Sequence, residues 1–337
     1  MKRNEMLKLL DETYEVLNHA NGEVALEQAL NFLASAPKEP DSFLLMAEIA
    51  QENSQSEQAL AWINKGLSFH PHHVGLLTKK ASLLMDDFED VDEAFAILSH
   101  LIDSFQKITP QNALRQIGHT LVLDVFLFFI DCLRLKGHYQ QAYDASLTAH
   151  DLAPNDESAV LALATAEFEL GHYDDSLKRI DHMLQKHDLA DLLRLKAYVL
   201  CAQGDFLKAD EAFLDSSKMS HARYHRPVRL TQEAFVQAFE QSILALPREI
   251  RELIETCAVE ICDIIPVERM KMNQGALSPQ ACITIDAGTN NDGKKINVIS
   301  LYQKNIENLA MRKEEIKDII ASALLHELGK TLGVMAV

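Results

Sequence analysis

GHYQQAYDASLTAHDLAP, residues 137–154, aligns with two later stretches of the chain. The second stretch is GHYDDSLKRIDHML, which begins at residue 171, and the third is GDFLKADEAFLDSS, which begins at residue 204. Their first glycines lie 34 and then 33 residues apart. A period of this length indicates one supersecondary unit that is repeated along the chain, because each copy buries its apolar face against the next.

Three shared positions predict a pair of antiparallel helices in each repeat. The glycine permits the turn out of the first helix, and an aromatic residue two positions later fills the gap between the helices. A small residue three positions further on lets the two backbones approach closely. The aromatic positions are Tyr139, Tyr173 and Phe206, and the small positions are Ala142, Ser176 and Ala209. A proline such as Pro154 then ends the second helix.

The period and the Gly-x-Tyr-x-x-Ala pattern resemble those of the tetratricopeptide repeat (TPR). Weaker copies precede residue 137, with apolar or small pairs at Ala25 and Ala29, Ala59 and Ile63, and Ala94 and Leu98. We count about six units over residues 1–220, enough to stack into a continuous core. The resemblance implies an all-α solenoid whose concave groove binds peptide segments of partner proteins. The alternative, that the repeats only support the C-terminal part, stays open.

The composition argues against several classes of partner. A formal net charge of −18 disfavours nucleic acid and anionic membranes, since both repel an acidic surface. The most apolar run, residues 121–133, is too short to span a bilayer and contains two aspartates. The five cysteines are scattered and odd in number, which predicts free thiols and a cytoplasmic location.

The pattern changes after the segment HARYHRPVRL, residues 221–230, which we interpret as a junction. Thr231 is placed to cap a helix, and Pro247 opens another. Strands are predicted over residues 258–265, 281–288 and 295–302, the last two joined by a hairpin turn at Asp292-Gly293. A long helix over residues 312–332 follows. We therefore predict a small α+β domain over residues 231–337, after a repeat domain over residues 1–220.

The final helix carries the sequence LLHELGKTLGV, residues 324–334. Together with Leu301-Tyr302, Ile306-Glu307 and Gly333, this stretch resembles the minimal zincin-like metallopeptidase family of small bacterial α+β domains. The resemblance covers about the last hundred residues. It implies that an extended substrate adds to a sheet edge, and it suggests VISLY, residues 298–302, as that edge.

The zinc motif of that family, HExxH, is incomplete here. By resemblance, His326 matches the first zinc ligand and Glu327 the general base, but Lys330 occupies the position of the second ligand. No acidic residue follows Gly333 as a third ligand. A protonated lysine has no lone pair to donate, and freeing one at neutral pH costs about 4–5 kcal/mol. His326 and Glu327 are therefore interpreted as vestiges, and no cofactor is expected.

Two readings of function remain open from the sequence. The favoured one is a protein-interaction protein with a TPR groove for partner polypeptides and an inactive zincin-like domain, in which Lys330 pairs with Glu327 or a nearby carboxylate. The alternative is an active zinc metallopeptidase whose repeats recruit the substrate and whose metal has non-standard ligands. The candidates for those ligands are His221, His225, Cys257, Cys262 and Cys282.

Overall fold

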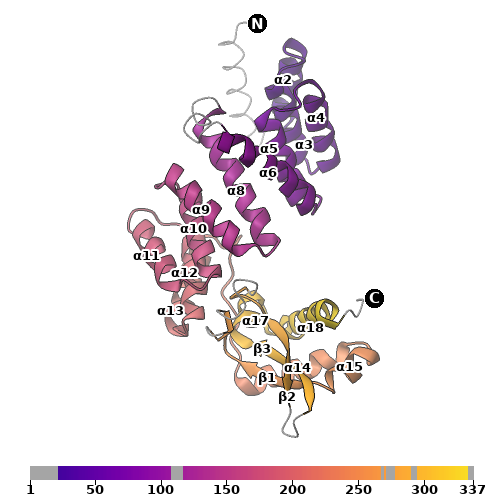
Figure 1. Cartoon of the computed structure of the whole chain (residues 1–337), viewed down its shortest axis with the longest axis vertical. Helices are drawn as coiled ribbons and strands as arrows, with labels where there is room; N and C mark the ends of the chain where they lie inside the picture. The colour runs from indigo at the N-terminus through magenta and orange to yellow at the C-terminus, as the bar shows by residue number, and fades with distance from the viewer. Residues whose placement is uncertain (1–21, 108–116, 267–268, 271–277, 290–293, 333–337) are drawn as a thin grey trace. The chain divides into compact units, whose positions relative to one another are not determined.

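The computed structural model describes residues 22–107, 117–266, 269–270, 278–289 and 294–332 (Figure 1). The chain divides into two compact units, Met1–Ala159 and Val160–Val337. Among the described helices, none has both the length and the apolar character that a bilayer crossing requires. The predicted turn at Asp292-Gly293 and the residue Gly333 lie outside the described residues.

The first unit consists of helices that pair through short turns. Its elements are α2 (Gly22–Ser35), α3 (Pro40–Glu52), α4 (Ser56–Phe69), α5 (Val74–Asp86), α6 (Val91–Lys107), α8 (His119–Leu135), α9 (Tyr139–Leu152) and the start of α10 (Glu157–Glu169). Helices α3 and α4, α5 and α6, and α8 and α9 form hairpins. The core of the α3–α5 region contains Phe43, Ile63 and Leu76, all fully buried. Within it, a Cβ on Gly66 would lie 2.9 Å from that of Phe43, so glycine permits this close approach.

The second unit begins with the same architecture and then changes class. Helix α11 (Tyr173–Leu184) follows α10, and α12 (Ala190–Ala202) pairs with α13 (Phe206–Met219). Ala142, Ser176 and Ala209, the small positions predicted at helix contacts, are fully buried. Next come α14 (Gln232–Ala245), which Thr231 caps as predicted, and α15 (Arg248–Ile254). The rest comprises three strands, helix α17 (Gln303–Leu309), the short η1 (Lys313–Glu315) and α18 (Ile316–Leu332).

The turns inside the hairpins share one backbone geometry. Gly137, Gly171 and Gly204 have φ values of 72°, 78° and 81°, and in each turn the next amide donates to a carbonyl five residues earlier. Ser54, between α3 and α4, has φ 58° and the same hydrogen-bond pattern, from Gln55 N to Ala50 O. This left-handed helix end favours glycine, so the serine is strained where the later repeats are not.

We therefore expect Ser54→Gly to stabilise the chain by about 0.5–1 kcal/mol. The left-handed conformation costs a non-glycine residue about 1–2 kcal/mol, and the freer unfolded chain of the glycine variant offsets part of this gain. Urea unfolding midpoints measure the change. As a control, Ser68→Gly on the exposed side of α4 should lower stability, since glycine inside a helix costs about 0.5–1 kcal/mol. A destabilised Ser54→Gly variant would contradict this account.

The described sheet has the strand order β1-β3-β2, where β1 is Ala258–Cys262, β2 is Ile283–Thr289 and β3 is Lys295–Tyr302. β1 runs parallel to β3, and β2 runs antiparallel to it. The expectation that residues 298–302 form the sheet edge is therefore wrong, because β3 is the central strand. Its residues 299–302 are fully buried on both faces, which is typical of a central strand.

The two faces of the sheet differ in chemistry. One face presents Ile283, Ile285, Ile299 and Leu301, which join α14 and α18 in a single apolar core. The other face carries polar groups around the fully buried Tyr302. Arg269 donates to the Tyr302 hydroxyl (2.6 Å) and to Ser300 Oγ (3.0 Å), and it also pairs with Asp286. Thr284 Oγ1 lies 3.0 Å from the Tyr302 hydroxyl. The apolar face therefore positions α18, and the polar face is satisfied internally.

Candidate functional site

Helix α18 holds the HELGK segment in a fixed orientation. Its fully buried residues recur at four-residue spacing and fasten it to the apolar face of the sheet: Ile316, Ile320, Leu324 and Leu328. His326 and Glu327 lie outside this stripe, with side chains 74% and 23% exposed. Lys330 lies one turn beyond His326 on the same side of the helix, and it is exposed.

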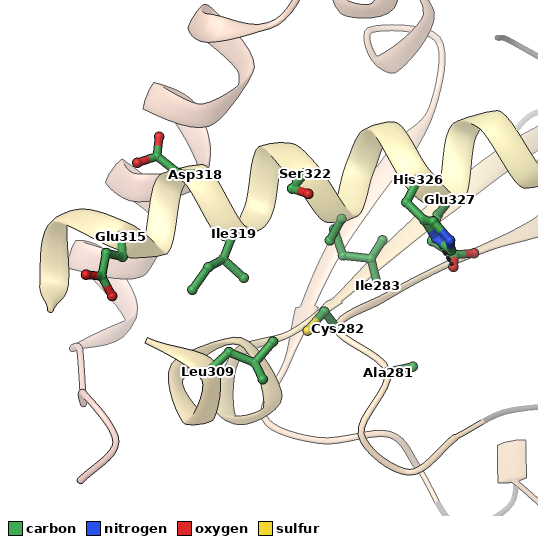
Figure 2. A pocket seen from close by; sticks show the side chains of 11 residues that line it. Ala281, Cys282, Ile283, Leu309, Glu315, Asp318, Ile319, Ser322, His326 and Glu327 are labelled. Atoms are coloured by element: carbon green, nitrogen blue, oxygen red, sulfur yellow. Dashed lines mark hydrogen bonds and ion pairs between the residues drawn. The ribbon is translucent and has the colours of Figure 1, made fainter. Parts of the chain in front are cut away.

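The contacts of Glu327 differ from those expected. Its carboxylate oxygen Oε1 lies 3.3 Å from His326 Nδ1, and Figure 2 shows the two side chains beside each other. Among the described residues, no ion pair joins Lys330 to Glu327 or to another carboxylate, so neither form of the expected pairing is present. Glu327 lines a groove next to β2, and Lys330 is not among the lining residues of that groove.

The groove lies between α18 and the beginning of β2 and has a volume of about 720 Å³. Figure 2 shows residues from α18 on one side and from the start of β2 and the end of α17 on the other. Its lining residues on the α18 side are Glu315, Asp318, Ile319, Ser322, Ala323, His326 and Glu327, and on the other side Ala281, Cys282, Ile283 and Leu309. The sequence analysis missed most of them, although residues 315, 319, 322 and 326 recur at helical spacing and share one face.

Both parts of the chain are similar to known proteins. Residues 280–336 match the model of the zincin-like metallopeptidase family. Among solved structures, PilF of Pseudomonas aeruginosa is 17% identical, with a TM-score of 0.51 over 64% of this chain and 92% of that chain. PilW, a type IV pilus biogenesis factor, is 17% identical, with a TM-score of 0.53 over 67% of this chain and 97% of that chain. YrrB, a TPR protein with an unusual peptide-binding site, is 15% identical, with a TM-score of 0.40 over 58% of this chain and 93% of that chain.

The chain therefore joins a helical-repeat array of the TPR fold to a segment, residues 280–336, that matches the zincin-like family model. At 17% identity, PilF and PilW show a shared fold alone. No curated protein matches the chain.

The donor atoms of the zincin-like domain do not fit the zinc ion that its family implies. In the described part of the chain, no three His, Cys, Asp or Glu side chains gather where they could hold a metal ion. Of the alternative ligands, only Cys282 shares the groove with His326. Burial raises the pKa of the Cys282 thiol to about 11, which disfavours the thiolate form that binds metals.

Glu307, part of the Ile-Glu segment quoted for the resemblance, has a structural role that the sequence did not reveal. Its carboxylate is fully buried and accepts hydrogen bonds from Leu230 N (3.0 Å) and Gln303 Nε2 (2.6 Å). Two cations neutralise it, Lys304 at 3.1 Å and Arg229 at 3.3 Å. The zincin-like domain therefore contains a buried, fully partnered carboxylate close to its junction with the repeats.

The same ion network reaches the last repeat. Arg229 also pairs with Asp210 on α13, at 2.6 Å. On α12, the nearly buried Arg194 donates to the carbonyl oxygens of His225 (2.8 Å) and Asn308 (3.4 Å). Residues 221–230, interpreted as a junction, are thus tied both to the last helix pair and to α17.

Proposed function

We propose that this chain is a protein-interaction protein in which the repeat array binds partner polypeptides and the zincin-like domain recognises peptides without hydrolysing them. The observation that carries the proposal is Lys330, which occupies the second-ligand position on the same side of α18 as His326. A catalytic zinc site usually has three protein ligands, and an ammonium group at this position repels a divalent cation. The free thiols among the described residues fit a cytoplasmic setting.

The first test is metal binding by the purified full chain. We expect less than stoichiometric zinc by elemental analysis and no tight binding by calorimetric titration, because the donor set around His326 is incomplete. Tight binding of one zinc ion per chain would contradict the proposal. It would favour the alternative, an active metallopeptidase with non-standard ligands.

The second test restores the missing histidine. We expect Lys330→His to leave turnover of casein or a fluorogenic peptide at background, because it adds one ligand where a catalytic zinc usually needs three, and the described residues offer no cluster of three donors. Lys317→His, at an exposed position near the other end of α18, is the matched control. Robust, chelator-sensitive turnover by the Lys330→His variant alone would count against the proposal.

A further inference from the structure

We infer that the groove between α18 and β2 binds an extended segment of a partner polypeptide in which an apolar side chain is flanked by lysine or arginine. The inference rests on the proposed function, since it requires that the zincin-like domain recognises a peptide and leaves it intact. Three features of the groove support it: an apolar floor, an open strand edge and an acidic wall.

The floor of the groove suits one apolar side chain. Ile319 on α18 and the almost fully buried Ile283 on β2 both line the groove, and the small side chain of Ala323 also lines it. Leu309, at the end of α17, also lines the groove and is 53% exposed, so it offers apolar surface to a bound side chain. A volume of about 720 Å³ falls within the range of pockets that bury a small ligand. The groove can therefore hold one large apolar side chain with part of its backbone.

The strand beside the groove has unpaired backbone groups. Cys282 O accepts a hydrogen bond from Tyr302 N, and residues 282 and 302 lie opposite each other in the register. Because hydrogen-bonded and non-hydrogen-bonded pairs alternate in an antiparallel ladder, Ile283, Ile285 and Ala287 direct their N–H and C=O groups away from β3. In the described sheet, β2 has no neighbour on that side. An extended peptide can satisfy these groups by adding a strand.

The negative charge of the groove determines which charge a bound segment can carry. Three carboxylates line the groove, Glu315 from η1 and Asp318 and Glu327 from α18. Arg312 pairs with Glu315 at 2.8 Å and the His326 ring lies 3.3 Å from Glu327, so among the described lining carboxylates Asp318 has the least screened charge. Among the described lining residues, no lysine or arginine opposes them. With a net charge of −18 on the chain, an acidic segment is repelled and a basic one is attracted.

The first part of the experiment varies the peptide and uses the full chain. A fluorescent decapeptide with a central leucine between lysines is compared by anisotropy with three relatives: glutamate for lysine, serine for leucine, and N-methylation of alternate backbone amides. We expect the parent peptide to bind at least about tenfold more tightly than each relative, because each removes one of the three features. Equal affinity for the lysine and glutamate peptides would overturn the inference and leave the proposed function standing.

The second part locates the binding site. Asp318→Lys, at an exposed position of the wall, should weaken binding of the parent peptide about tenfold. Glu240→Lys makes the same charge change on the exposed side of α14, outside the groove, and should leave the affinity unchanged. Equal effects of the two variants would overturn the inference. Chelator-sensitive cleavage of the peptide would instead overturn the proposed function, so the two failures are distinguishable.

Discussion

Glu307→Ala is expected to destabilise the second unit by about 3–5 kcal/mol. Removing this fully buried carboxylate leaves Arg229 and Lys304 without their shared counter-charge, in side chains that are only 24% and 15% exposed. It also leaves the amide of Leu230 without its acceptor. Breaking a buried ion pair by deleting one partner costs this much because the remaining charges stay desolvated. Chemical denaturation followed by circular dichroism measures the loss.

Amide hydrogen exchange shows which helices the Glu307→Ala substitution destabilises. We expect faster exchange in both α13 and α17, since Arg229 pairs with Asp210 on the first helix and with Glu307 on the second. Glu252→Ala, which breaks an exposed pair with Arg248, is the control and should change stability by less than about 0.5 kcal/mol. A loss below about 1 kcal/mol for Glu307→Ala would show that the network is not needed to hold these helices together.

The repeat fold was predictable because its signal is local and recurs. Gly137, Gly171 and Gly204 mark turns that the structure forms with almost identical φ values, and the aligned small positions are buried as expected. The earlier repeats gave a weaker signal for a physical reason: Ser54 tolerates the left-handed conformation that glycine adopts more easily. Secondary structure beyond residue 230 was also predictable in order and type, from caps, alternation and turn residues.

The site was less predictable because its contacts are distant in sequence. Nothing near Glu307 indicates that Arg229, 78 residues earlier, neutralises it. The order of the strands also had to come from the structure, since a hairpin leaves both outer edges available and β1 occupies one of them. The expected pair between Lys330 and Glu327 failed because helical spacing permits a contact without requiring it. Because β3 is the central strand of the described sheet, the open strand edge beside α18 is that of β2, where the groove lies.

Leu324→Ala should cost about 2–5 kcal/mol, because Leu324 is fully buried where α18 crosses the apolar face of the sheet. Leu325, the next residue, is only partly buried, so Leu325→Ala is the matched control with an expected loss of about 1 kcal/mol or less.

The same two variants test whether the packing of α18 against the sheet is needed for peptide binding. The Leu324 stripe holds α18 against the sheet, and the peptide groove is formed by the same helix and β2. Under conditions where the Leu324→Ala variant remains folded, its affinity for the lysine-leucine peptide should fall more than that of Leu325→Ala; equal affinities would show that the groove keeps its shape without this anchor.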